Sequence, residues 1–276
     1  MRERESQPVA VIAAAGRGTR FRHETPKVLA DVGGRSCLQR VIDAVEGGLG
    51  EHLQIIVVGH EAEQVIEAVG RASHRRFVRQ HEPRGTGHAL LTALAEVPAD
   101  RNGGLYFFCG DKPLLRAETV RRFRERFASS SSAMLFLTGL IEGDDDAVRT
   151  NRQGRVVWTR HDGEAHALAI VERKVIDAIA ESEIFRLYNG DVHRFSRDQL
   201  LAIREVNVST YAWSLPALRR LVDELSDDNP QGEYLVTDLV QIFLRHHLPV
   251  QTIGLTDPAE GKGIDTVEQW LELAQV

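Results

Sequence analysis

The first half of the chain alternates short apolar runs with segments whose apolar residues recur every three or four positions. The runs predict buried strands. The first run begins at Val9, and the others cover 55–58, 77–78, 105–109 and 133–137. The periodic segments predict helices with apolar positions at Leu38, Val41, Ile42 and Val45, Ala62, Val65, Ile66 and Val69, Leu90, Leu91 and Leu94, and Val120, Phe123 and Phe127. This alternation predicts an α/β fold, a single Rossmann-like, mostly parallel sheet with helices on both faces.

The pattern changes after Glu142. Alternating residues at 155–160 and 167–172 predict a β-hairpin with a turn at 161–163, and the stretch 175–197 is expected to be less regular. A strand is expected at 205–213, helices around 218–225 and 235–243, a strand at 250–253 and a helix around 267–271. We therefore expect a loose tail at 1–7 and one domain at 8–276. Its core is mainly 8–140, its β-rich lobe mainly 141–250, and 251–276 returns to the core.

Composition narrows the class of protein. The chain has 276 residues and a formal net charge of −6, which argues against a general nucleic-acid binder. Its two cysteines, Cys37 and Cys109, lack metal-ligand spacing and are expected to be reduced core thiols. The sequence shows neither a run long enough to span a membrane nor a secretory h-region. We expect a cytoplasmic protein with no membrane partner.

Small residues and cations follow the first predicted strand: Ala14, Ala15, Gly16, Gly18, Thr19, Arg20 and, further on, Lys27. Glycines let backbone N–H groups approach a phosphate, and the cations add charge that stabilises it. The glycines alone are equally consistent with a tight turn. The dinucleotide fingerprint fails because its third glycine would fall at Phe21, and no Gly-Lys-Ser/Thr completes a Walker loop.

Three later positions carry groups that suit a nucleotide and a metal ion. The Gln80 amide can pair with a pyrimidine edge, or it is a solvated loop residue. Asp111 follows a predicted strand, where a carboxylate can hold magnesium against phosphate oxygens, or it simply ends that strand. Asp265 can supply the second carboxylate, or it is the N-cap of the last helix.

Together these motifs resemble the signature of sugar nucleotidylyltransferases, and most of all the uridylyltransferase part of bacterial N-acetylglucosamine-1-phosphate enzymes. The matching segments begin at Ala14, Pro26, Gly85, Gly110, Ile170, Glu205, Asn229 and Gly263. The resemblance implies a GT-A-like nucleotidyltransferase fold with a sugar-binding lobe. The hexapeptide-repeat acetyltransferase half is not in this sequence, so no acetyl transfer is expected.

The resemblance also implies roles for individual residues. Arg20 and Lys27 would be catalytic, and Asp111 and Asp265 would hold Mg²⁺. The nucleotide would be bound by Ala14, Ala15, Gly16, Gly18, Thr19, Gln80, Gly85 and Thr86, and the sugar by Glu172, Lys174 and Asn207. The chain departs from the family pattern at 146–148 and 207–209, and 175–197 resembles an insertion. An acceptor other than N-acetylglucosamine 1-phosphate is therefore expected.

The resemblance, together with these residues, implies magnesium-dependent transfer of a nucleoside monophosphate from a triphosphate, UTP or dTTP, to a sugar 1-phosphate. Two alternatives remain at this point, a glycosyltransferase that uses a nucleotide sugar and a non-catalytic nucleotide-binding protein. A glycosyltransferase usually shows an Asp-x-Asp pair after the strand, where this chain has Gly110-Asp111-Lys112-Pro113. The expected partners are the two substrates, and the prediction leaves room for a homo-oligomer.

Overall fold

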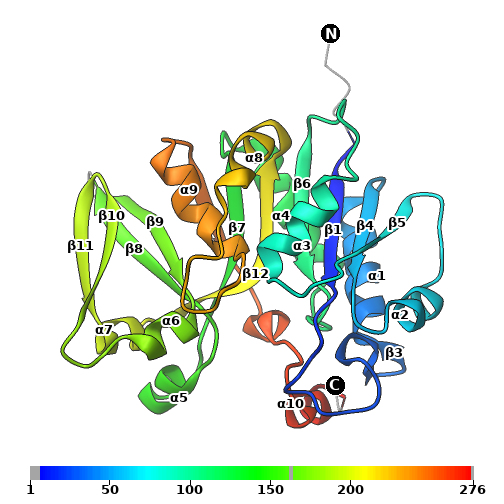
Figure 1. Ribbon diagram of the computed structural model, residues 1–276, viewed down its shortest axis with the longest axis horizontal. Coiled ribbons are helices and arrows are strands. Elements are labelled where there is room, and N and C mark those ends of the chain that lie inside the picture. Colours follow the sequence, from blue (N-terminus) through cyan, green and yellow to red (C-terminus); the bar gives the residue numbers. More distant parts are fainter. Residues whose placement is uncertain (1–6, 162–163, 275–276) are drawn as a thin grey trace.

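A central sheet carries the fold of this computed structural model, which describes residues 7–161 and 164–274 (Figure 1). Residues 1–6 of the expected tail and the turn residues 162 and 163 lie outside the described residues. Seven strands lie in the order β13 (Val250–Gly254), β7 (Met134–Leu140), β12 (Glu205–Ser214), β6 (Gly104–Cys109), β1 (Val9–Ala14), β4 (Leu53–Val58) and β5 (Arg75–Arg79). β8 (Arg155–His161) pairs with β12 and with β9 (Glu164–Val171).

Most neighbouring strands within the seven-strand order are parallel. β1 pairs in parallel with β4 and β6, β4 with β5, and β13 with β7. β12 is antiparallel to both β6 and β7, and β8 is antiparallel to β12 and β9. The prediction of a mostly parallel sheet is confirmed, and the carboxyl ends of β1, β4 and β6 meet at one edge.

Helices cover both faces because successive strand residues point to opposite sides. Val9 and Val11 pack toward one side, which contains α3 (Thr86–Leu94), α8 (Leu215–Leu221) and α9 (Leu239–Arg245). Ala10 and Ile12 pack toward α1 (Cys37–Leu49), α2 (Ala62–Val69) and α4 (Ala117–Ser129). The Ser36 hydroxyl accepts a hydrogen bond from the Gln39 N–H, so the predicted N-cap of α1 is confirmed.

The lobe beside the sheet has its own small core (Figure 1). It contains α5 (Asp145–Thr150), β8, β9, α6 (Arg173–Ala178), β10 (Ile184–Asn189), β11 (Asp191–Ser196) and α7 (Arg197–Leu201). The expectation that 175–197 is irregular is wrong, because β10 and β11 form an antiparallel hairpin. Gly190 turns it with a φ of 76°. Asn-Gly between extended segments is a strong hairpin signal, and it predicts this turn correctly once it is considered.

The C-terminal segment returns to the N-terminal end of the chain. Short 3-10 helices and strands fill the loops here: η1 (Lys27–Leu29), β2 (Asp31–Val32), β3 (Arg35–Ser36) and η4 (Pro258–Gly261), followed by α10 (Val267–Leu273). Ile264 is fully buried in a cluster with Phe21 and Val32, and the Trp270 indole donates to the Asp31 carbonyl oxygen at 2.6 Å. Figure 1 accordingly shows α10 beside β3.

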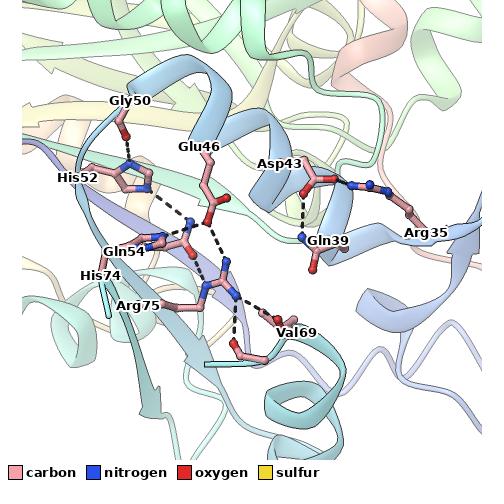
Figure 2. A network of polar contacts seen from close by, with 11 residues as sticks. Arg35, Gln39, Asp43, Glu46, Gly50, His52, Gln54, Val69, His74 and Arg75 are labelled. Atoms are coloured by element: carbon pink, nitrogen blue, oxygen red, sulfur yellow. Dashed lines mark hydrogen bonds and ion pairs between the residues drawn. The ribbon is translucent and has the colours of Figure 1, made fainter. Parts of the chain in front are cut away.

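A polar network ties the amino ends of β4 and β5 to α1 (Figure 2). The Arg75 guanidinium donates to Glu46 Oε1 at 2.8 Å, to Gln54 Oε1 at 2.6 Å and to the Val69 carbonyl oxygen at 3.1 Å. Gln54 is fully buried, and every such buried polar group needs a partner. The network therefore fixes the edge strand β5 from the end opposite the glycine loop. Within the described residues, no helix is long and apolar enough to cross a bilayer.

Candidate active site

A cleft of about 600 Å³ opens at the carboxyl ends of β1 and β6, between the sheet and the lobe. It is lined by nearly all residues that the sequence singled out: Ala14, Ala15, Gly16, Gly18, Thr19, Arg20, Lys27, Gln80, Gly85, Thr86, Asp111, Glu172, Lys174 and Asn207. Asp265 is outside this lining, but it forms ion pairs with Lys27 and Arg20, which are part of it.

An ionic cluster joins the N-terminal loop to the two distant carboxylates. Lys27 Nζ lies 2.6 Å from Asp111 Oδ2 and 3.2 Å from Asp265 Oδ1, and Arg20 Nη2 lies 3.1 Å from Asp265 Oδ2. The Lys27 side chain is only 14% exposed, whereas that of Arg20 is 55% exposed. The basic turn and both predicted acidic residues therefore meet in one place.

Lys27 and Asp111 each stabilise the charged form of the other. Burial by itself raises the pKa of the Asp111 carboxyl, but the ammonium groups of Lys27 and Lys112 outweigh it and hold that pKa below its usual value. Burial likewise lowers the pKa of Lys27, and Asp111 and Asp265 reverse the effect, so that it lies well above the ordinary value. At neutral pH the lysine is cationic and Asp111 is anionic.

The oxygen atoms here suit a hard divalent cation. Asp111 Oδ1 is buried and has no hydrogen-bond partner among the described residues, so one lone-pair-bearing oxygen of this carboxylate is left for a ligand. Oxygen donors are what Mg²⁺ prefers, and it is usually held by one or two carboxylates together with substrate phosphates. In the described part of the chain, no three His, Cys, Asp or Glu side chains gather as metal ligands. Phosphate oxygens would complete this set.

Asp265 is not the N-cap of the last helix. The Thr266 hydroxyl accepts from the Gln269 N–H, and the Gln269 side chain accepts from the Thr266 N–H, which forms a complete capping box. The capping role that the sequence left open thus belongs to the next residue. The Asp265 side chain is available to Lys27 and Arg20.

Four hydrogen bonds hold the segment that carries Asp265, and Glu260, which accepts two of them, was not singled out in the sequence. The Ile264 N–H donates to the Asp111 carbonyl oxygen at 3.0 Å, and Lys112 Nζ donates to the Gly261 carbonyl oxygen at 3.0 Å. Glu260, only 4% exposed, accepts from the Arg116 N–H and the Thr119 hydroxyl, both at 2.9 Å, and so caps α4. The sequence shows only a Glu two residues after Asp-Pro, and the partners of Glu260 lie far away along the chain.

At the other end of the cleft, Gln80 lies beside the loop that begins α3. Gln80 Nε2 donates to the Gly85 carbonyl oxygen at 3.1 Å and contacts His88 Nδ1 at 2.9 Å. The Thr86 hydroxyl accepts from the Val236 N–H, and the Gly87 N–H donates to the Tyr234 carbonyl oxygen at 2.7 Å. The segment around Tyr234 is thereby docked onto the loop that carries Gly85.

The lobe and β12 line a further part of the cleft, with Glu172 and Asn207 respectively. Burial raises the pKa of the Glu172 carboxyl, and the nearby Asp238 and Glu233 carboxylates raise it further. Asn207 lies at a bulge in β12, where its Oδ1 accepts from the Ser209 N–H at 2.9 Å. This bond leaves the Asn207 amide NH₂ as its donor group.

One predicted residue lies at the edge of the cleft, and two residues that line the cleft were not predicted. Lys174 is 67% exposed and lies 3.8 Å from Glu233 Oε1, at the edge of this group of residues. Arg152 and Tyr211 also line the cleft, and sequence reasoning did not identify them. Tyr211 lies within the apolar run of β12, where nothing in the sequence distinguishes a cleft-lining ring from a core one.

The Rossmann-like sheet, the glycine loop at the end of β1 and the paired carboxylates facing two cations define a nucleotidyltransferase domain. A family model described as MobA-like NTP transferase domain matches residues 10–199. The chain belongs to this family, and the resemblance noted in the sequence is confirmed.

Curated relatives extend the similarity over nearly the whole chain. The bifunctional protein GlmU of Solibacter usitatus is 34% identical over 272 residues, which cover 98% of this chain and 52% of that protein. The GlmU of Alcanivorax borkumensis is 36% identical over 266 residues, 96% of this chain and 50% of that protein. The chain thus spans about half the length of these relatives.

Solved structures show the same fold at low identity. UDP-glucose pyrophosphorylase in complex with UDP-glucose matches with a TM-score of 0.63 and 15% identity, covering 97% of each chain. CMP:2-keto-3-deoxy-manno-octonic acid synthetase in complex with CTP matches with a TM-score of 0.63 and 16% identity, covering 98% of each chain. The predicted α/β nucleotidyltransferase-like fold is confirmed.

Proposed function

We propose that this protein transfers a nucleoside monophosphate from a nucleoside triphosphate to a sugar 1-phosphate, giving a nucleotide sugar and pyrophosphate. The observation that carries the proposal is the meeting of Arg20 and Lys27 with Asp111 and Asp265 at the mouth of the glycine loop. A protein that only binds nucleotide needs the loop, but it has no use for two carboxylates held against two cations. The family and the GlmU relatives support the same reaction class.

The proposed mechanism relies on positioning and charge. Backbone N–H groups of Gly16 and Gly18 bind phosphate oxygens, and Arg20 and Lys27 stabilise the charge that develops as pyrophosphate leaves. The phosphate oxygen of the acceptor is already anionic at neutral pH, so the in-line attack on the α-phosphorus needs no general base. Asp111 and Asp265 would hold Mg²⁺, which supplies charge neutralisation between phosphate oxygens when it is bound.

The orientation of Gln80 supports UTP or dTTP as the donor. The Gly85 carbonyl oxygen can only accept a hydrogen bond, so the contact at 3.1 Å fixes the amide with Nε2 toward Gly85. Oε1 is then the group that remains for a ligand, and in the proposed complex it accepts from the N3–H of uracil or thymine. Cytosine carries no hydrogen at N3 and is expected to be a poor substrate.

At the acceptor end, Glu172 and Asn207 offer an acceptor group and a donor group, which suits the hydroxyls of a sugar. We propose Lys174 as an outer contact, because it is well exposed and its partner Glu233 is 3.8 Å away. The acceptor is proposed to be a sugar 1-phosphate other than N-acetylglucosamine 1-phosphate. Both substrates are cytoplasmic metabolites, so a cytoplasmic location stays part of the proposal. Homo-oligomer formation and the lack of a nucleic-acid partner stay predictions.

One experiment tests the reaction class directly. The purified chain is mixed with Mg²⁺, each common nucleoside triphosphate and a panel of sugar 1-phosphates, and pyrophosphate release is measured. We expect release only when both substrates are present, with UTP or dTTP giving the highest kcat/KM. Release that needs no sugar 1-phosphate, or none with any pair, contradicts the proposal. A glycosyltransferase instead consumes a finished nucleotide sugar and releases no pyrophosphate.

A further inference from the structure

The two proposed metal ligands share a cation in the structure, and that cation is the ammonium group of a side chain. Lys27 Nζ is bonded to Asp111 Oδ2 at 2.6 Å and to Asp265 Oδ1 at 3.2 Å. Arg20 occupies the other carboxylate oxygen of Asp265 at 3.1 Å. A divalent cation that joins Asp111 Oδ2 to Asp265 Oδ1 would have to take the position of the Lys27 ammonium group.

We propose that Lys27 is an internal competitor of the divalent cation, so that the cation binds tightly only together with the nucleotide. This inference rests on the proposed function, because it takes Asp111 and Asp265 as the metal ligands. Lys27 thereby has a role before the reaction as well as in it. It keeps the carboxylate pair neutralised and folded in place while no metal is bound.

The structure also shows how a nucleotide would release Lys27. The alkyl stem of Lys27 lies along the glycine loop, and a Cβ added at Gly18 would be 3.3 Å from Lys27 Cγ. Phosphates bound on this loop place new anionic oxygens beside the ammonium group. The ammonium can then exchange a carboxylate for a phosphate, and the vacated carboxylate oxygens become available to a metal ion that also contacts the phosphates.

Without Lys27, the carboxylate pair loses the cation that joins its members. Asp265 keeps Arg20, which is half exposed. Asp111 keeps the charge of Lys112, whose Nζ donates to the Gly261 carbonyl oxygen. Two anionic groups facing each other at close range attract a divalent cation strongly in a partly buried site. Removal of Lys27 should therefore strengthen metal binding in the absence of nucleotide. A general loss of structure would instead weaken it.

The test measures Mn²⁺ binding by electron paramagnetic resonance on the nucleotide-free full chain, with no turnover involved. We expect Lys27→Met to bind Mn²⁺ at least tenfold more tightly than the wild type, and Lys27→Arg to remain like the wild type. Lys112→Met is the matched control for charge: it removes a positive charge next to the same carboxylate, together with a hydrogen bond to Gly261, but it leaves Lys27 in the shared position. It should change the affinity by no more than about threefold, the scale of a screened charge near a surface.

A second variant locates the effect. In Lys27→Met with Asp111→Asn, the gain in Mn²⁺ affinity should disappear. An unchanged or weaker affinity in Lys27→Met, or an equal gain in Lys112→Met, overturns the inference. If Lys27→Met does not fold, the wild type still decides, because nucleotide-free protein that binds Mn²⁺ as tightly as protein saturated with α,β-methylene-UTP also overturns it. Pyrophosphate release by the wild type tests the proposed function separately.

Discussion

The docking of the segment around Tyr234 onto the loop of Gly85 leads to a sharp prediction for Gly85→Ala. Gly85 has a φ of 98° and a ψ of 176°, a region that only glycine adopts readily. A Cβ at this position would also overlap the Tyr234 carbonyl oxygen and come within 3.0 Å of Glu233 Cβ. The substitution therefore adds backbone strain and a collision with backbone atoms, which cannot rotate away.

Gly70 provides the matched control. It has nearly the same conformation, with a φ of 76° and a ψ of 160°, but a Cβ there would meet nothing within 4 Å. Strain of this kind costs about 1–3 kcal/mol, and both variants carry it. Gly85→Ala must in addition disturb the hydrogen bonds from the Gly87 N–H to Tyr234 and from the Tyr234 N–H to Arg84. Each such bond contributes about 1 kcal/mol, so Gly85→Ala should be less stable than Gly70→Ala by about 1–3 kcal/mol.

Urea unfolding of both variants measures the difference in the free energy of unfolding, and pyrophosphate release measures function. The Tyr234 segment contacts both the loop of Gly85, which is proposed to bind the base, and the proposed sugar-binding residue Lys174 through Glu233. Gly85→Ala should therefore raise the KM values of both substrates. We expect kcat/KM to fall about tenfold or more, which corresponds to about 1.4 kcal/mol, while Gly70→Ala keeps wild-type kinetics. Equal stability of the two variants, or a kinetic defect shared by both, refutes this reasoning.

Three further predictions concern separate parts of the chain. Lys27→Ala and Asp111→Asn should fold like the wild type and lose about 10²–10³ in kcat, about 2.7–4 kcal/mol, in the pyrophosphate assay; near-wild-type rates contradict the assignment. Burial lowers the pKa of His52 below 6.5, so unfolding takes up a proton below that pH, and the free energy of unfolding decreases as the pH is lowered. In urea unfolding measured across pH, His52→Gln should make this decrease less steep, and an unchanged slope counts against the prediction. Glu260→Gln should lower the free energy of unfolding by about 1–2 kcal/mol by weakening the cap of α4, whereas the exposed Glu118→Gln in the same helical turn should change it far less; equal effects exclude the cap.

Local patterns predict most of the central sheet and its helices, because the spacing of apolar residues indicates which face of each element is buried. The strands β1, β4 and β6 are continuous apolar runs, and α1 combines a periodic stripe with a serine cap. The lobe was harder to predict because its hairpin β10–β11 alternates weakly and two of its apolar side chains, Ile184 and Val192, remain 40% exposed. Weak alternation hides a strand unless the turn itself is recognised.

The residues of the candidate site were predicted from motifs, but the tertiary contacts that support them were not. Glu260, Lys112 and Tyr234 act through partners more than a hundred residues away, and no local periodicity reports such a pairing. The side-chain orientation of Gln80 also depends on a carbonyl group from another loop. Sequence reasoning names the groups that do chemistry, whereas tertiary contacts decide which atoms of those groups face a ligand.

The separation of Asp111 and Asp265 along the chain has a consequence for how the site forms. Asp265 follows the lobe and the last strand in the chain, and the Ile264 N–H bonds to the backbone of Asp111 itself. A main-chain hydrogen bond thus positions the two carboxylates relative to each other, while Lys27 in the N-terminal loop bonds to both carboxylate groups. A change that detaches the C-terminal segment leaves Lys27 with Asp111 alone. The carboxylate pair, and with it a shared cation, exists only in the fully folded chain.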